Sequence, residues 1–360
     1  MIAGAKLALG LMSGTSLDGV DAALLWTDGE TAGEAGEAIT IPYPDELRHR
    51  LRSVLGGVGP IKEVEHEITL FHAGVAKALL RQAGEPRVEV VGFHGHTILH
   101  QPENRRTWQI GDGDLLAKLL QVPVVNDFRS ADVEAGGQGA PLLPAFHGAL
   151  AVGRDLPLAI LNIGGVANVT WIGQDGRLLA FDTGPGNAMI DDWVLRHSGH
   201  RYDEGGKLAA KGKADPELID GFLSHPYFGR KPPKSLDRDD FNKHAAALVE
   251  QLAVEDGAAA LTAFTIASIQ QSSHWFPEPA HGWLVCGGGR HNAALMAGLR
   301  AALGVPVEPV ERLGWSGDAI EAQGFAYLAV RSLKGLPLSW PGTTGVPEAI
   351  TGGRLHRPPV

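Results

Sequence analysis

Hydrophobic and polar positions at the start of the chain follow a pattern typical of two strands joined by a turn. Residues 6–12 form an apolar run, and residues 20–26 place apolar side chains close to every second position. The polar turn Gly14–Gly19 between them has glycines and hydroxyl groups that suit a backbone curled around a bulky anion. Asp18 adds a carboxylate that could hold Mg²⁺, directly or through water. An ordinary β-hairpin is the alternative, and this stretch alone leaves both open.

The pattern then alternates between helix and strand periods. Apolar residues at a three-to-four spacing predict an amphipathic helix over 61–82. Residues 87–93 predict a buried strand that enters a polar turn, His94–Thr97, and residues 122–125 predict a short strand. Alternating strands and helices indicate an α/β fold with a largely parallel sheet.

A second cycle of the same kind begins near residue 156. Strands are predicted at 156–165, 167–172 and 178–182, and an Ala-rich helical region over 241–276, broken near Asp256–Gly257. The order of strand, glycine turn, strand and Asp-Gly turn repeats that of the first 30 residues. Such a weak repeat is typical of two similar halves around a cleft, although unrelated glycine-rich hairpins could mimic it. We expect an N-terminal lobe of residues 1–130 plus 335–360 and a C-terminal lobe of residues 131–334.

Composition narrows the class of protein. The length of 360 residues favours two domains, and the net charge of −10 argues against nucleic-acid or anionic-membrane partners. One cysteine, Cys286, excludes an internal disulfide and fits a reducing compartment. The N-terminal apolar run is too short to span a bilayer and is a poor signal peptide. We therefore expect a cytoplasmic protein.

Candidate chemistry in the second cycle lies at two glycine-rich strand ends. Asp182, at a strand end before Gly184, is a candidate general base because ligands of open α/β sheets bind at the carboxyl ends of strands. Its alternative role is to cap the following turn or helix. Gly287–Gly289 would let a nucleoside approach the backbone. The sequence contains no Walker motif and no G-x-G-x-x-G opening a βαβ unit.

Candidate polar ligands in the first cycle follow two predicted strands. His94, His96 and His100 cluster, but no carboxylate triad or cysteine pair lies near them, so hydrogen bonding to a polyhydroxyl ligand is favoured over zinc. Arg129 follows the strand at 122–125 and could clamp a carboxylate through two N–H groups. A structural Arg–Asp pair is the alternative.

Eight long motifs, in one order along nearly the whole chain, resemble the anhydro-N-acetylmuramic acid kinases of bacterial peptidoglycan recycling. The motifs are MSGTSLDGVDAAL (12–24), GFHGHTILHQP (92–102), TWQIGDGDLLA (107–117), NDFRSADVEAGGQGAPL (126–142), NIGGVANVT (162–170), FDTGPGNAMIDDW (181–193), YDEGGKLAAKG (202–212) and CGGGRHN (286–292). The resemblance implies an α/β, two-lobed actin-like ATPase fold, in which a ribonuclease H-like unit is duplicated around a central cleft.

The same resemblance implies an activity and a set of site residues. The enzyme would use ATP and Mg²⁺ to hydrolyse the 1,6-anhydro ring of 1,6-anhydro-N-acetylmuramic acid and to phosphorylate its 6-oxygen, and would be a homodimer. Asp182 would be the catalytic base, and Glu321 would orient the sugar or the attacking water. Implied to bind ATP or the metal are Gly14, Thr15, Ser16, Leu17, Asp18, Gly19, Val20, Asp21, Gly184, Gly287, Gly288, Gly289 and Asn292, with Asp18 at the metal. Implied to line the sugar are His96, Thr97, Arg129 and Asp132, with Arg129 at the lactyl carboxylate.

One departure from the family pattern and three rival functions stay open. Gly324 stands where the family has alanine, and glycine inside a helix costs about 1 kcal/mol. A related sugar or carboxylate kinase would use Asp182 to activate a substrate hydroxyl. An actin-like or chaperone-like ATPase would turn over ATP without a sugar. A binding protein without catalysis is disfavoured by the presence of Asp18 and Asp182.

Overall fold

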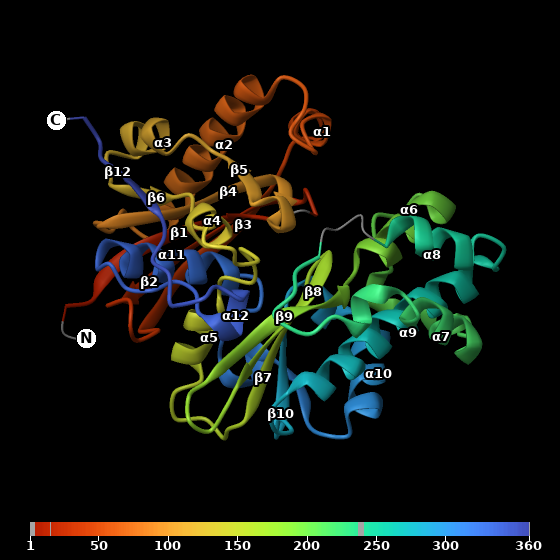
Figure 1. Cartoon of the computed structure of the whole chain (residues 1–360). Helices are drawn as coiled ribbons and strands as arrows, with labels where there is room; N and C mark the ends of the chain where they lie inside the picture. Colours follow the sequence, from red (N-terminus) through yellow and green to blue (C-terminus); the bar gives the residue numbers. More distant parts are fainter. Residues whose placement is uncertain (1–3, 15, 237–240, 360) are drawn as a thin grey trace. The chain divides into compact units, whose positions relative to one another are not determined.

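The computed structural model describes residues 4–14, 16–236 and 241–359 (Figure 1). The chain divides into two compact units, residues 1–152 with 318–360 and residues 153–317. Residues 131–152 and 318–334, which we expected in the second lobe, belong to the first unit. None of the helices in the described part of the chain combines the length and the apolar character that a membrane crossing requires.

Seven strands form one sheet among the described residues of the first unit. Its strands are β1 (Lys6–Ser13), β2 (Gly19–Thr27), β3 (Glu34–Pro42), β4 (Val90–Gln101), β5 (Arg106–Ile110), β6 (Val124–Asn126) and β12 (Arg354–His356). Its helices are α1 (Asp45–Ser53), α2 (Ile61–Gln82), α3 (Gly113–Leu120), α4 (Ser130–Glu134), α5 (Pro144–Leu150), α11 (Ile320–Leu333), α12 (Pro341–Thr344) and the 3₁₀ turn η1 (Pro102–Asn104).

The second unit holds a sheet of five strands in its described part. The strands are β7 (Leu158–Ile163), β8 (Val166–Ile172), β9 (Leu178–Pro185), β10 (Gly282–Cys286) and β11 (Val307–Pro309). The helices are α6 (Ala188–Ser198), α7 (Pro216–Leu223), α8 (Asn242–Val249), α9 (Val254–Ser272) and α10 (Ala293–Leu303). The 3₁₀ turns are η2 (Glu204–Gly206), η3 (Ala209–Lys211), η4 (Pro226–Gly229), η5 (Ser273–Trp275), η6 (Gly288–His291) and η7 (Val310–Leu313).

The two sheets share one topology. In the first, β1, β2 and β3 form an antiparallel meander, and β4 and β6 continue from β1 in parallel. In the second, β7, β8 and β9 form the meander, and β10 and β11 continue from β7 in parallel. The predicted α/β class and internal repeat are therefore confirmed at the level of strand order. The prediction of a largely parallel sheet was wrong, because the meander makes both sheets mixed.

Helix α2 supplies the core of the first unit as its periodicity predicts. It spans the predicted residues 61–82, and Val64, Ile68, Ala76 and Leu79 are buried on one face. A fully buried side chain of this kind contributes roughly 1.5–3 kcal/mol.

Helix α11 rests directly on the sheet of the first unit because two strands carry glycine at the crossing. A side chain at Gly10 of β1 would overlap the carbonyl oxygen of Ala322, and one at Gly92 of β4 would overlap that of Phe325. The helix continues through Gly324, where an added Cβ would lie 2.5 Å from Cδ2 of Leu143. Close packing against Leu143 therefore accounts for glycine at this position.

Two local predictions were wrong. His94–Thr97 do not form a turn but continue strand β4, because β5 provides a partner that pairs His96 with Ile110. The Ala-rich helical region is interrupted at residues 250–253, between α8 and α9, and Asp256–Gly257 lie inside α9. Gly257 is needed there for packing, since a side chain at this position would overlap the ring of Trp193.

Candidate active site

The predicted site residues divide between the two units, and each set is described within its own unit. The first unit holds the turn Gly14–Asp21, His96, Thr97, Arg129, Asp132 and Glu321. The second unit holds Asp182, Gly184, Gly287–Gly289 and Asn292. Thr15, predicted to bind the nucleotide, lies outside the described residues.

The turn between β1 and β2 is held by hydrogen bonds of its own backbone and of its neighbours. Leu17 has a φ of 62°, and its N–H donates to the carbonyl oxygen of Gly14 at 3.1 Å. Arg48 Nε donates to the carbonyl oxygen of Leu17 at 3.0 Å, and the N–H of Tyr43 donates to that of Asp18 at 3.0 Å. The turn is thus tied to the start of α1, which fixes the direction of its backbone groups.

The side chains of the turn take different roles. Ser16 and Asp18 are exposed, whereas Leu17 and Val20 fill the core and can offer a ligand only their backbone. Gly14 has open space around it, with Ser16 Oγ 3.8 Å from an added Cβ. Gly19 is required by strand pairing, because a side chain there would overlap the carbonyl oxygen of Ile41.

Three carboxylates gather close to this turn. Oδ1 of Asp21 accepts a hydrogen bond from Thr40 Oγ1 at 2.6 Å. Burial and the negative charges of Asp318 and Asp18 together raise the pKa of Asp21 to about 6, against the hydrogen bond from Thr40, which lowers it. No group of three ligating His, Cys, Asp or Glu side chains is preassembled among the described residues. The mutual repulsion of these carboxylates is the electrostatic setting that a divalent cation relieves.

His96 belongs to a buried hydrogen-bond chain at the end of β1. Tyr43 Oη donates to Ser13 Oγ at 2.9 Å, and Ser13 Oγ lies 2.9 Å from Nδ1 of His96. Burial lowers the pKa of His96 to about 3, so its imidazole is neutral at physiological pH. Its Nε2 is buried and has no hydrogen-bond partner within the described chain. Such a group is costly to leave unsatisfied, which marks it as a candidate contact for a polar ligand.

Arg129 is oriented by a neighbouring imidazole rather than left as a free surface charge. Its Nε and Nη2 donate to Nε2 of His94 at 3.2 and 3.0 Å, and Nη1 donates to the carbonyl oxygen of Gly139 at 2.7 Å. His94 Nδ1 in turn donates to the carbonyl oxygen of Gly95 at 2.9 Å. Burial and the charge of Arg129 keep the pKa of His94 well below its usual range. Neutral His94 thus fixes the plane of the guanidinium.

Two more residues predicted to line the sugar, Asp132 and Thr97, differ in burial. Asp132 is buried, and its Oδ1 accepts from the N–H of Gly139 at 2.6 Å while Oδ2 accepts from Thr344 Oγ1 at 2.6 Å. It therefore ties the Gly139 loop to the C-terminal segment. Thr97 is half-buried, and its hydroxyl accepts from Gln109 Nε2 at 3.3 Å.

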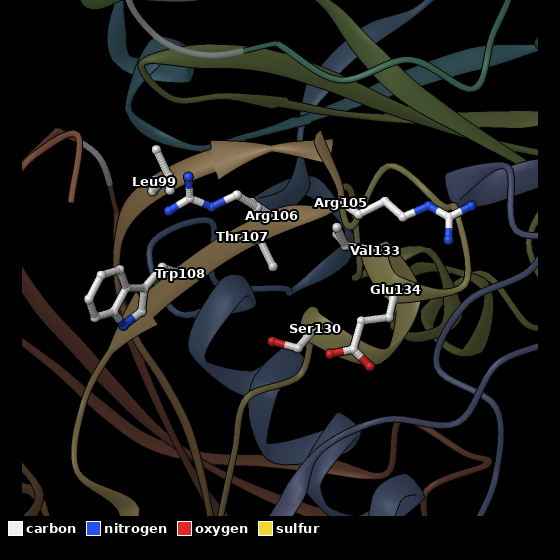
Figure 2. Close-up of a pocket in the computed structure, with 8 residues that line it drawn as sticks. All are labelled: Leu99, Arg105, Arg106, Thr107, Trp108, Ser130, Val133 and Glu134. Carbon is white, nitrogen blue, oxygen red and sulfur yellow. The ribbon is translucent and has the colours of Figure 1, made fainter. Parts of the chain in front are cut away.

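A pocket that the sequence analysis did not single out lies between the β4–β5 hairpin and α4 (Figure 2). Its lining residues are Leu99, Arg105, Arg106, Thr107, Trp108, Ser130, Val133 and Glu134, and its volume, including the open mouth, is about 470 Å³. Figure 2 shows the hairpin side chains opposite Ser130 and Glu134 of α4. The two guanidiniums make its hairpin side positive. The pocket adjoins Arg129 along the chain, because α4 begins at the next residue.

Glu321 lies in the first turn of α11 and is half-buried. An acidic side chain at this end of a helix interacts favourably with the unpaired N–H groups of the first turn. The residue is therefore placed by the same close packing of α11 that Gly10 and Gly92 permit.

In the second unit, Asp182 is buried on β9 and held on three sides. The N–H of Leu236 donates to Oδ2 of Asp182 at 2.8 Å. The N–H of Asp182 donates to the carbonyl oxygen of Lys234 at 3.0 Å, and its carbonyl oxygen accepts from Tyr227 Oη at 2.5 Å. The N-cap position of the next helix, α6, is Asn187, so the alternative that Asp182 caps this helix is wrong.

Two of the three glycines at the end of β10 pack directly against the end of β7. Gly287 has a φ of 74°, and a side chain there would overlap Oδ1 of Asn162. A side chain at Gly289 would overlap Cγ2 of Ile163, whereas Gly288 has space. Oδ1 of Asn162 is buried without a hydrogen-bond partner in the described chain. The sequence analysis used the motif that begins at Asn162 but did not select this residue as a ligand contact. Its position at a strand end, directly before a Gly-Gly turn, could have indicated one.

Two other predicted nucleotide contacts have structural roles. Oδ1 of Asn292 accepts from the N–H of Leu295 at 3.1 Å and caps α10. Gly184 packs against α9, where an added Cβ would lie 2.8 Å from Oγ of Ser268. Both residues shape the surroundings of Gly287 and Asp182 through packing and capping.

Comparison with known proteins agrees with the motif pattern over the full length. The family model described as anhydro-N-acetylmuramic acid kinase matches residues 6–357. A protein of that name from Paramagnetospirillum magneticum is 60% identical over 98% of this chain and 100% of its own length. Those from Rhodospirillum rubrum and Acidiphilium cryptum are 54% and 53% identical, covering 97% and 98% of this chain and 94% and 98% of their own. The chain therefore belongs to the anhydro-N-acetylmuramic acid kinase family.

Proposed function

We propose that this protein is an ATP-dependent kinase that opens the 1,6-anhydro ring of 1,6-anhydro-N-acetylmuramic acid and phosphorylates the 6-oxygen. The products are N-acetylmuramic acid 6-phosphate and ADP, and the reaction belongs to peptidoglycan recycling. Membership of the family, with 60% identity to a relative named for this activity, supports the substrate and the reaction class. The observation that carries the mechanism is the buried carboxylate of Asp182, with Oδ2 fixed by the N–H of Leu236.

The phosphates of ATP are assigned to backbone N–H groups of the turn Gly14–Asp21. The nucleoside is assigned to Gly287–Gly289, where Gly288 is exposed and has space, and Oδ1 of Asn162 supplies a buried acceptor beside Gly287. Asp18 would hold Mg²⁺, with Asp21 near it, and the ion would neutralise negative charge on the phosphates.

The chemistry couples hydrolysis to phosphoryl transfer. Asp182 accepts a proton from a water molecule as the water oxygen bonds to carbon 1 of the sugar. The bond between carbon 1 and the bridging oxygen breaks, and that oxygen, which stays on carbon 6, bonds to the γ-phosphorus as ADP leaves. A positioned general base typically contributes about 10²–10⁴-fold to the rate. Positioning and electrostatic stabilisation by the phosphate-binding turn contribute the rest.

The sugar is assigned to polar groups of the first unit. Arg129, held in one plane by His94, binds the lactyl carboxylate. The unpartnered Nε2 of His96 and the hydroxyl of Thr97 bind sugar hydroxyl groups. Glu321 orients the sugar or the attacking water. Asp132 acts through the loop that it holds, since both of its oxygens accept hydrogen bonds within the protein.

Isotope labelling tests the coupled reaction. The protein is incubated with ATP, Mg²⁺ and the anhydro sugar in ¹⁸O-water, and the product is analysed by mass spectrometry. We expect a phosphorylated product with the label at carbon 1 and unlabelled oxygen at carbon 6. Turnover of an ordinary reducing sugar with the anhydro sugar untouched would identify a different sugar kinase, and ATP turnover independent of any sugar would identify an ATPase.

The metal, the oligomeric state and the location stay predictions. Activity that is lost with a chelator and restored by Mg²⁺ would support the metal assignment. Light scattering after size-exclusion chromatography would test the expected homodimer against the monomer mass of 38.0 kDa. Fractionation of the native host would test the expected cytoplasmic location.

A further inference from the structure

One short segment, Tyr227–Leu236, surrounds Asp182 with hydrogen bonds. Two of its residues bind the backbone of Asp182: the hydroxyl of Tyr227 donates to its carbonyl oxygen, and the carbonyl oxygen of Lys234 accepts from its N–H. A third, Leu236, donates its N–H to the carboxylate. The segment lies far from Asp182 in the sequence and begins within the 3₁₀ turn η4. A carboxylate that serves as a base must keep one orientation, and these contacts supply the restraint.

Lys234 is the member of this segment whose side chain the mechanism does not yet use. It is only 2% exposed, and its Nζ donates to the carbonyl oxygen of Tyr227 at 3.0 Å. The ammonium also lies over the ring of Tyr227, 4.3 Å from the ring centroid, and 6.0 Å from that of Trp275. Lysine is seldom buried unless something compensates for its charge.

The charged and titratable groups around Lys234 identify its carboxylate partner. Burial and the positive charge of Arg230 together lower the pKa of Lys234 to about 8, against the negative charge of Asp182, which raises it. Arg230 lies over the same ring, with its guanidinium 5.6 Å from the centroid of Tyr227. His225 accepts from the N–H of Tyr227 at 3.3 Å. Lys234 therefore keeps its proton at neutral pH, and within the described part of the chain the carboxylate that acts on its charge is that of Asp182.

We propose that Lys234 is a positioning residue for Asp182. The buried ammonium of Lys234 keeps the Asp182 carboxylate ionised and holds Tyr227 in place against the backbone of Asp182. This inference rests on the proposed function, in which Asp182 must be ionised to accept a proton from water. An opposite charge next to a carboxylate favours the ionised form, and loss of that charge leaves burial to favour the protonated form. Lys234 thus sets the lowest pH at which the enzyme works.

The test compares Lys234→Met, which keeps length but removes charge, with Lys234→Arg, which keeps the charge. Lys231→Met is the matched control, because Lys231 is exposed and lies in the same segment. The full pH profiles of kcat and of kcat/KM for the anhydro sugar are measured with each variant. For Lys234→Met we expect the acid limb to move upward by about one to three pH units, with kcat at pH 7 reduced correspondingly. Lys234→Arg should keep the acid limb near its original pH, and Lys231→Met should match the unmodified enzyme.

Two results would overturn the inference. One is an acid limb that does not move in Lys234→Met; the other is an equal shift in the Arg and Met variants. Asp182→Asn is assayed in parallel: if it retains activity, the proposed function fails rather than the role of Lys234. Should Lys234→Met not fold, as judged by its thermal transition and ATP binding, Lys234→Gln keeps a donor for the carbonyl oxygen of Tyr227 and gives the same readout without the charge.

Discussion

The guanidinium of Arg129 donates from two nitrogens to a single atom, Nε2 of His94, at 3.2 and 3.0 Å. Since arginine only donates, this nitrogen must be the acceptor, and the proton of the neutral imidazole lies on Nδ1, which donates to Gly95. A buried neutral histidine therefore serves as a support for an arginine. The pair gives Arg129 a fixed plane without neutralising its charge, as suits recognition of a carboxylate.

Replacing Arg129 by lysine should weaken binding of the sugar more than it slows the reaction. Lysine is a point charge that cannot donate two parallel bonds to a carboxylate, and hydrogen bonds to charged groups are worth about 1.5–3 kcal/mol. We expect KM for the anhydro sugar to rise at least about tenfold. Steady-state kinetics with the sugar as the varied substrate measure this. Arg81→Lys, on the exposed last turn of α2, is the control and should leave KM unchanged; an unaltered KM in Arg129→Lys would remove Arg129 from the carboxylate site.

Replacing Asp182 by asparagine should abolish turnover while the protein stays folded. The amide keeps the shape and can still accept from Leu236, but it cannot take a proton from water. We expect kcat to fall by about 10²–10⁴-fold or more, with the thermal transition and ATP affinity nearly unchanged. Asp175→Asn, on the exposed β8–β9 turn, controls for loss of charge. Undiminished activity in Asp182→Asn would contradict the mechanism.

Gly10→Ala and Gly74→Ala should change stability in opposite directions. A methyl group at Gly10 would overlap the carbonyl oxygen of Ala322, and neither backbone can move without disturbing the core. Gly74 lies in α2, where nothing stands within 4 Å of an added Cβ. We expect Gly10→Ala to destabilise by about 1–3 kcal/mol or more and Gly74→Ala to stabilise by about 0.5–1 kcal/mol. Urea unfolding measures both; a neutral Gly10→Ala would disprove the direct contact between helix and sheet.

The bond between Asp132 and Thr344 should contribute to folding stability. Asp132→Asn leaves one of two buried hydrogen bonds without a suitable partner, and an unsatisfied buried group costs about 1–3 kcal/mol. Thr344→Val removes only the hydroxyl. A double-mutant cycle of unfolding free energies should give a coupling of about 0.5–3 kcal/mol between the two positions. Additive losses would mean that the two side chains do not interact.

Asp21 should make stability depend on pH between about 4 and 6. Its pKa is raised from 3.8 to about 6 in the folded protein, so the folded state holds its proton more tightly than the unfolded state. This favours folding below pH 3.8, and the contribution is lost as pH rises through about 6. Asp21→Asn should therefore be more stable than the unmodified protein at pH 7. At pH 3.5 the two should converge, which serves as the internal control for urea unfolding. A variant less stable at pH 7 would contradict the cost of ionising Asp21, which comes first from burial and then from the neighbouring carboxylates.

Local patterns in the sequence were sufficient to predict the fold class and the family. The periodicity of residues 61–82 predicts α2 with its bounds, because one face of a helix must be apolar to cover a sheet. Repeated strand and glycine-turn order predicts the duplicated topology, since β1–β2 and β7–β8 are both antiparallel pairs joined by a turn that contains glycine. Strand β3 escaped prediction because it lies at the sheet edge and is mostly exposed, so its residues lack a clear alternation.

The features that the sequence did not predict depend on contacts between residues far apart in the chain. The sequence around Asp132 does not predict its contact with Thr344, and the sequence around Asp182 does not predict its contact with Lys234. Both contacts appear only when the chain is packed. The same holds for Gly19 and Gly257, whose need for glycine comes from a neighbouring strand and a tryptophan ring. The sequence by itself determined which elements form and to which family the chain belongs, because those depend on local periodicity and motif order. Only the tertiary structure decided which polar groups are consumed by the fold and which are left to meet a ligand, because burial and hydrogen bonding depend on partners far along the chain.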